Sequence, residues 1–142
     1  MITPDINLLI CAHNAADPQH VAAKEWWENC INESNPVGLP WAVMAGFIRL
    51  MTHPRVLEEP MPVADATSYV RSWLDQASVI VLEPSERFPT IFFNFLTELG
   101  SAGNLTTDAH IAALAVEKQA IVNSCDSDFS RFSGLNWKNP IA

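Results

Sequence analysis

Short apolar runs that end next to acidic residues constrain this chain more than any other feature. A run at residues 2–5 ends at Asp5, and a second at residues 120–123 is followed closely by Asp126 and Asp128. In a parallel α/β fold, reactive side chains gather at the carboxyl ends of the strands. We therefore expect these distant acids to converge, together with Asp108 at the start of an alanine-rich helical segment.

Carboxylates that converge repel one another unless a cation holds them together. Sites made only of oxygen ligands suit Mg²⁺ or Mn²⁺. The three acidic clusters, Asp5 with Asn7, Asp108, and Asp126 with Asp128, therefore predict a metal-dependent enzyme that acts on phosphate chemistry.

Helical and extended segments alternate along the chain, which predicts an α/β fold with a central, mainly parallel sheet. The clearest strand is residues 78–82, a continuous β-branched run typical of a parallel strand buried on both faces. The remaining expected elements are a short helical turn at 7–11, loops at 32–38 and 58–62, helices at about 17–30, 41–51, 63–76, 85–99 and 108–118, and a last strand at 135–137.

Composition limits the class of protein further. A chain of 142 residues that is 49% hydrophobic is large enough for one domain, residues 1–142, and too small for two. The formal charge of -8 counts against tight, nonspecific binding of nucleic acid, but a nuclease stays open because divalent cations and a few arginines offset local charge.

Cysteine usage and hydropathy indicate the compartment. Cys11, Cys30 and Cys125 are far apart and form no CxxC pair, which favours reduced thiols in a cytoplasmic protein. The apolar segment at residues 6–12 is too short to span a membrane, so no membrane association is expected.

Each acid also has an interpretation without catalysis. Asp5 and Asn7 are residue types that cap turns, and Asp128 lies in a loop-like segment. Asp108 falls in a first helical turn, where the helix dipole favours a carboxylate by roughly 0.3–1 kcal/mol, and Thr107 either assists the chemistry or caps the helix. The joint occurrence of three acid sites favours function.

In this order and at this chain length, the motifs resemble those of the PIN-domain ribonucleases, specifically the VapC toxins of bacterial toxin–antitoxin pairs. The likeness covers nearly the whole chain. The matching segments are residues 4–9, 39–41, 47–55, 103–110, 124–129 and 132–137.

The resemblance implies a three-layer α/β/α fold, Mg²⁺ or Mn²⁺ as cofactor, and cleavage of RNA phosphodiesters. It also implies a homodimer neutralised by a cognate antitoxin protein. The family's acids match Asp5, Asp108 and Asp126, with Asp128 as a neighbour or substitute. Many members carry a further glutamate on the helix before the Phe-x-Arg run, and here that place is Gly46.

The expected mechanism is in-line attack of water on an RNA phosphate, with Thr107 or Asn7 orienting the water and Arg49 either meeting the RNA backbone or forming a structural ion pair. Two alternatives remain. One is an aspartyl-phosphate phosphatase, which requires a second acid two residues after Asp5, at the position of Asn7. The other is a non-catalytic module that binds antitoxin or RNA, which Gly46 favours.

Overall fold

A five-stranded, entirely parallel sheet forms the centre of the computed structural model, which describes residues 1–142. The strand order is β3-β2-β1-β4-β5. The strands are β1 (Ile2–Pro4), β2 (Val37–Pro40), β3 (Val79–Leu82), β4 (Ile121–Asn123) and β5 (Trp137–Lys138).

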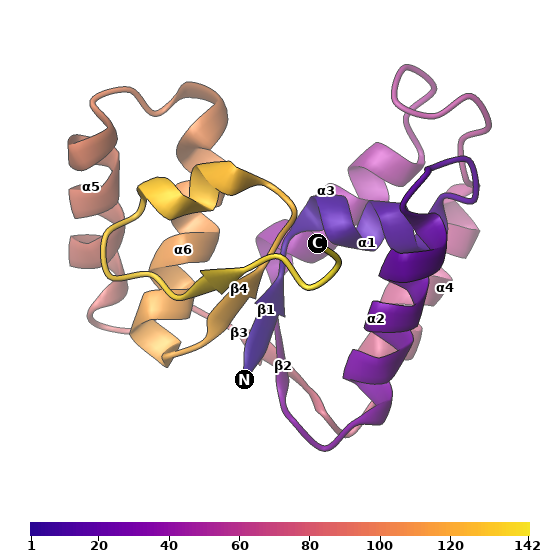
Figure 1. Cartoon of the computed structure of the whole chain (residues 1–142), viewed down its shortest axis with the longest axis horizontal. Coiled ribbons are helices and arrows are strands. Elements are labelled where there is room, and N and C mark those ends of the chain that lie inside the picture. The colour runs from indigo at the N-terminus through magenta and orange to yellow at the C-terminus, as the bar shows by residue number, and fades with distance from the viewer.

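Helices cover both faces of this sheet and give the three-layer α/β/α sandwich that the sequence predicts. In Figure 1, α5 and α6 lie on one side of the strands, and α1 to α4 lie on the other. The helices are α1 (Ile6–His13), α2 (His20–Asn32), α3 (Trp41–Met51), α4 (Val63–Leu74), α5 (Phe88–Leu99) and α6 (Thr106–Lys118), with short 3-10 helices at Gly103–Leu105 and Ser127–Arg131.

The direction of the chain across the sheet reverses beside β1. The chain passes from β1 to β2 to β3, and then crosses back over both to place β4 on the other side of β1. In open α/β sheets, such a reversal leaves a crevice at the carboxyl ends of the two central strands, where ligands bind. The ends of β1 and β4 are therefore the position at which a site is expected, and Asp5 follows β1 directly.

Buried apolar side chains of the core hold the helices against the sheet. Leu8 and Leu9 of α1, Phe47 of α3 and Trp73 of α4 are almost completely buried. Phe47 and Trp73 meet edge to face, with ring centroids 4.7 Å apart, an arrangement that aromatic pairs prefer. The α1–α4 layer is therefore held by aromatic packing as well as by aliphatic burial.

One expected loop is in fact a strand. Residues 37–40, placed at the end of a loop and the opening of a helix, form β2, and all four are buried. Gly38 and Pro40 weaken strand patterns in sequence. Gly38 is there because of packing, since a Cβ at this position would lie 2.6 Å from Cδ1 of Leu82 in β3.

Two smaller expectations also need correction. The strand expected at residues 78–82 is the edge strand β3, and Ile80 is 49% exposed, so the strand is not buried on both faces. Thr107 does not cap α6, because the helix already begins at Thr106 and its N-cap residue is Leu105.

None of the helices combines the length and the apolar composition needed to cross a lipid bilayer.

Candidate active site

Asp5 is fixed at the junction of β1 and α1 by three hydrogen bonds. Its N–H donates to the carbonyl of Asn123 on β4 at 2.9 Å. Its Oδ1 accepts the N–H of Ile6 at 2.7 Å, which caps α1, and its Oδ2 accepts the hydroxyl of Ser124 at 2.8 Å. With only 3% of its surface exposed, Asp5 is a rigid, buried carboxylate.

Ser124 connects the first acid to the late acids. Its hydroxyl oxygen donates to Asp5 and also accepts the N–H of Asp126 at 2.9 Å. Asp126 in turn accepts the N–H of Asp128 at 2.9 Å through its Oδ1, and so caps the short helix that begins at Ser127. The ends of β1 and β4 are thereby joined into one acidic site.

The first turn of α6 brings Asp108 into the electrostatic field of the same site. Partial burial, together with the charges of Asp5, Asp126 and Asp128, raises the pKa of Asp108 to about 7. Burial also raises the pKa of Asp5, opposed by its hydrogen bonds from Ser124 and Ile6 and assisted by the charge of Asp126. The structure thus places the four acids near enough for their charges to act on Asp108, although not in contact around one point.

The donor set fits a divalent cation in chemistry, although the side chains do not converge on one point as they stand. No three His, Cys, Asp or Glu side chains lie close enough together to hold one ion. Every acid of the cluster supplies oxygen, and their mutual repulsion is the force that a divalent cation relieves. A shared ion would therefore require the carboxylates to move closer together than they stand.

The three supporting residues named from sequence lie at the surface. Asn7 and Thr107 are exposed in the first turns of α1 and α6, and no side-chain hydrogen bond joins Asn7 to Asp5. Arg49 is exposed near the end of α3 and forms no salt bridge, so the structure gives it no ion-pair partner.

Ser124 is the residue that sequence reasoning missed as part of the site. A serine after a strand is a common turn residue, and only its position next to the end of β1 reveals its role. The usable signal was the order of strand, serine and acid in residues 121–126, because the carboxyl ends of neighbouring parallel strands meet.

We expect Ser124→Ala to weaken the site without removing an acid. The change leaves Asp5 with one fewer donor, which raises its pKa further, and leaves the N–H of Asp126 unpaired. Loss of such a supporting hydrogen bond typically costs roughly 10–100-fold in metal affinity or activity. Mn²⁺ titration checks this, with Ser127→Ala as the exposed control; equal affinities for both variants would show that Ser124 does not support the acids.

Gly46 lies against the residue that follows Asp5. A Cβ at Gly46 would be 2.5 Å from Cδ1 of Ile6, so no side chain fits there while Ile6 keeps its place. The resemblance implies a glutamate at this position in many family members. In this chain the side chain of Ile6, on α1, occupies that space instead.

We expect Gly46→Ala to destabilise the protein in the presence of Ile6 and to stabilise it when Ile6 is Ala. Overpacking costs about 1–3 kcal/mol, which exceeds the roughly 0.5–1 kcal/mol that alanine gains over glycine inside a helix. Denaturant unfolding of the two single variants and the double variant measures this. The same sign in both backgrounds would contradict the proposed clash.

Comparison with known proteins identifies the family. The PIN domain pattern matches residues 2–135. The chain is 43% identical over 141 residues to Ribonuclease VapC33 of Mycobacterium tuberculosis strain H37Rv, covering 99% of both chains, and 36% identical over 138 residues to Ribonuclease VapC37 of the same strain, covering 97% and 96%. The chain therefore belongs to the PIN domain family and, within it, to the VapC group, which confirms the resemblance drawn from its motifs.

Solved structures support the same fold. The crystal structure of Mycobacterium tuberculosis VapC20, described as a toxin that cleaves the sarcin-ricin loop, superposes with a TM-score of 0.70 at 20% identity over 95% of this chain and 96% of that one. VapBC-1 from nontypeable Haemophilus influenzae gives 0.67 at 18% identity over the full length of both chains. At these identities the likeness is one of fold.

Proposed function

We propose that this protein is a Mg²⁺-dependent endoribonuclease toxin that hydrolyses RNA phosphodiester bonds. The observation that carries the proposal is the joined acidic site at the ends of β1 and β4, in which Ser124 links Asp5 to Asp126 and the charges of three acids act on Asp108. Relatives that match along the whole chain are named ribonucleases, which supports RNA as the substrate.

Asp5, Asp108 and Asp126 are the residues that would hold Mg²⁺, or Mn²⁺ in its place, with Asp128 beside them. When bound, the ion supplies positive charge at the scissile phosphate and lowers the pKa of the attacking water. Asp5 contributes a carboxylate already fixed by the backbone and by Ser124, so little ordering remains to be done on binding.

The remaining residues act on the substrate and the water. Without metal, Asp108 has a pKa near neutrality, so binding of a cation there would release its proton. Thr107 and Asn7 stand exposed on the first turns of their helices, where either orients the water, and Arg49 offers an unpaired positive charge to the RNA backbone. In-line attack on phosphorus breaks the bond to the 3′ oxygen and leaves a 5′-phosphate and a 3′-hydroxyl.

The direct test is cleavage of RNA by the purified protein with Mg²⁺, with EDTA, and with Mg²⁺ restored after EDTA. The expected result is cleavage that disappears on chelation and returns with the metal. Cleavage that persists in EDTA would contradict the proposed metal dependence.

A PIN module that binds without cleaving is the second candidate. Two observations favour it: Gly46 leaves no room for a further acid, and no three acids lie within reach of one ion as they stand. Binding of RNA that survives Asp5→Asn, with no cleavage under any metal, would select this function over the first.

We also propose a cognate antitoxin as partner, a homodimer as the assembly and the cytoplasm as the place of action. Structural neighbours include antitoxin complexes such as VapBC2 from Rickettsia felis bound to promoter DNA, with a TM-score of 0.65. Co-expression with the protein encoded next to this gene, followed by light scattering of the purified species, tests the partner and the assembly together.

A further inference from the structure

Every polar group of Ser124 has a partner, and one of these partners is a tryptophan on the neighbouring strand β5. Ser124 is completely buried just beyond the end of β4. Its hydroxyl joins Asp5 to Asp126, and its N–H donates to the carbonyl of Lys138 at 3.1 Å. Its carbonyl accepts the indole Nε1–H of Trp137 at 3.0 Å. The residue that links the acids is therefore itself held from β5.

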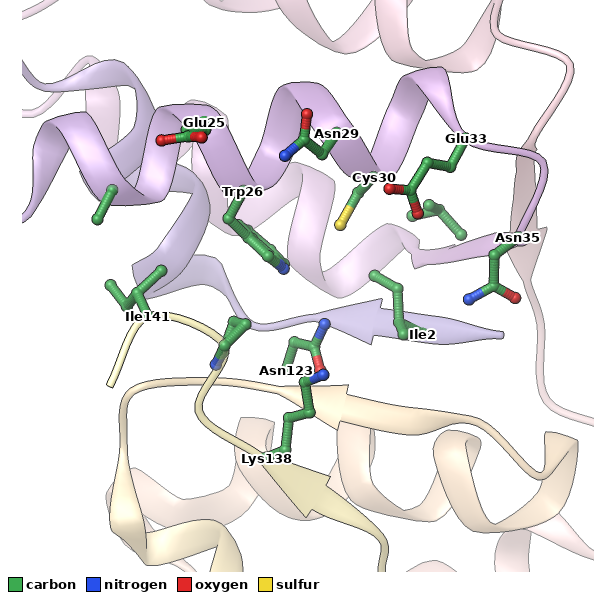
Figure 2. A pocket seen from close by; sticks show the side chains of 13 residues that line it. Ile2, Glu25, Trp26, Asn29, Cys30, Glu33, Asn35, Asn123, Lys138 and Ile141 are labelled. Carbon is green, nitrogen blue, oxygen red and sulfur yellow. The ribbon is translucent and has the colours of Figure 1, made fainter.

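The register of the sheet brings this tryptophan within reach of Ser124. The last residue of β4 is Asn123, which pairs with Lys138 of β5. Figure 2 shows these two residues on the neighbouring strands. Trp137 lies one residue before Lys138, and Ser124 lies one residue beyond Asn123. The Trp137 side chain therefore reaches past the end of the paired segment to the Ser124 carbonyl.

The sheet itself offers no donor to the Ser124 carbonyl. β4 ends at Asn123 and β5 ends at Lys138, so the ladder of backbone hydrogen bonds stops before this group. Buried backbone carbonyls in folded proteins are almost always paired, and the single N–H of an indole supplies the missing donor here. With its N–H bonded to Lys138 and its carbonyl bonded to Trp137, Ser124 is held on both sides.

We propose that Trp137 is a positioning residue of the acidic site, whose indole N–H holds Ser124 so that the Ser124 hydroxyl keeps Asp5 in place for the metal ion. This inference rests on the proposed function, because it gives Trp137 a part in the same site. The indole donates to Ser124 and not to any of the acids, so its effect passes through Ser124. Supporting residues that orient the groups around a metal typically change metal affinity or activity roughly 10–100-fold.

The first measurement is a double-mutant cycle, read by calorimetric titration of Mn²⁺ into the full-length protein. Trp137→Phe removes the indole N–H and keeps an aromatic ring against the core. We expect this change to weaken Mn²⁺ binding by about tenfold in the wild-type background, and by no more than about twofold in the Ser124→Ala background. The effect should shrink because the hydroxyl through which Trp137 acts is already gone. Circular dichroism verifies that each variant is folded.

Trp26→Phe is the matched control. Both tryptophans are half-buried and pack against the core. Figure 2 shows Trp26 directed from α2 toward the sheet, and it makes no hydrogen bond to Ser124. We expect Trp26→Phe to leave Mn²⁺ affinity unchanged. The same loss in both tryptophan variants, or a full loss from Trp137→Phe in both backgrounds, would show a general structural contribution and overturn the proposal.

Amide hydrogen exchange without metal, followed by NMR, tests the hold on Ser124 separately. The N–H of Asp126 is protected by its bond to the Ser124 hydroxyl. We expect Trp137→Phe to speed exchange of this amide several-fold relative to Trp26→Phe, because Ser124 becomes free to move. Exchange in the buried middle of α6, for example at Leu114, should not change, which distinguishes a local loosening from a loss of global stability.

The outcomes separate this inference from the proposed function. Absence of Mn²⁺ binding by the wild-type protein would contradict the proposed function, and the role of Trp137 would fall with it. If the wild type binds Mn²⁺, two results would overturn the role of Trp137 alone. One is unchanged exchange at Asp126 in Trp137→Phe, and the other is faster exchange there with unchanged Mn²⁺ affinity.

Discussion

Asp5→Asn is expected to reduce RNA cleavage by at least about 10³-fold, because several kcal/mol of charge stabilisation at the phosphate are lost and each 1.36 kcal/mol is a factor of ten in rate. The fold should survive. The asparagine retains an oxygen that accepts the N–H of Ile6 and so still caps α1. What disappears is the buried negative charge at the end of β1.

Asp75→Asn is the matched control for this result. Asp75 is an exposed aspartate at the end of α4, and the same chemical change there leaves the acidic site intact. Cleavage of RNA is measured for both variants beside the wild type, with circular dichroism to verify folding. Full activity of a folded Asp5→Asn protein would remove Asp5 from the mechanism.

Asp108→Asn is expected to abolish cleavage and yet to stabilise the metal-free protein at alkaline pH. Asp108 has a pKa raised to about 7 by burial and by its acidic neighbours, whereas an unfolded aspartate titrates near 4. The folded state therefore holds this proton more tightly than the unfolded state does. The stabilisation is fully present below about pH 4 and is lost as the pH rises through about 7.

At pH 8 without metal, the charged Asp108 opposes folding, and asparagine removes that cost. Because the side chain is about half exposed, solvent screening reduces the gain to about 1 kcal/mol, or roughly 3 °C in Tm for a domain of this size. The control is Asp65→Asn in the first turn of α4. There the helix dipole stabilises the exposed carboxylate of Asp65. Its loss should lower Tm slightly, so the two variants should shift in opposite directions; a fall in Tm for Asp108→Asn would contradict the repulsion within the site.

The parts of the fold that sequence predicts well are those with strong local signals. The helix Trp41–Met51 agrees with its expected bounds, and Gly100 ends α5 in a left-handed conformation, with φ of 70°, as a terminal glycine is expected to do. Pro4 closes β1, at the end of the strand, where proline is tolerated. In these places the local sequence by itself determines the backbone structure, so the sequence is enough to predict it.

Elements fixed by tertiary contact were harder to predict. The strand β2 exists because β1 and β3 pair with it on both sides, and its glycine is required by Leu82 of the neighbouring strand, which sequence alone does not reveal. The exposure of Ile80 follows from the place of β3 at the edge of the sheet, which depends on strand order.

The candidate site shows the same difference between residues with a local sequence signal and residues whose role depends on tertiary contacts. Sequence reasoning singled out Asp5, Asp108, Asp126 and Asp128 because acids next to strand ends and helix starts have a chemical explanation, and their roles as ligands stay predictions. It gave Ser124 no role, although its hydroxyl holds Asp5 and Asp126 in one network. The roles of Asn7, Thr107 and Arg49 stay predictions, since all three are exposed side chains that RNA or water would order.

The most direct test of the central claim is calorimetric titration of Mn²⁺ into wild type and Asp5→Asn at pH 6 and pH 8. With a pKa of about 7 for Asp108, the fraction of that carboxylate free to bind falls about tenfold from pH 8 to pH 6, so Mn²⁺ should bind the wild type about tenfold more tightly at pH 8. Asp5→Asn should show no binding at either pH. Equal binding by both proteins, or wild-type affinity that does not change with pH, would contradict a metal held by these acids.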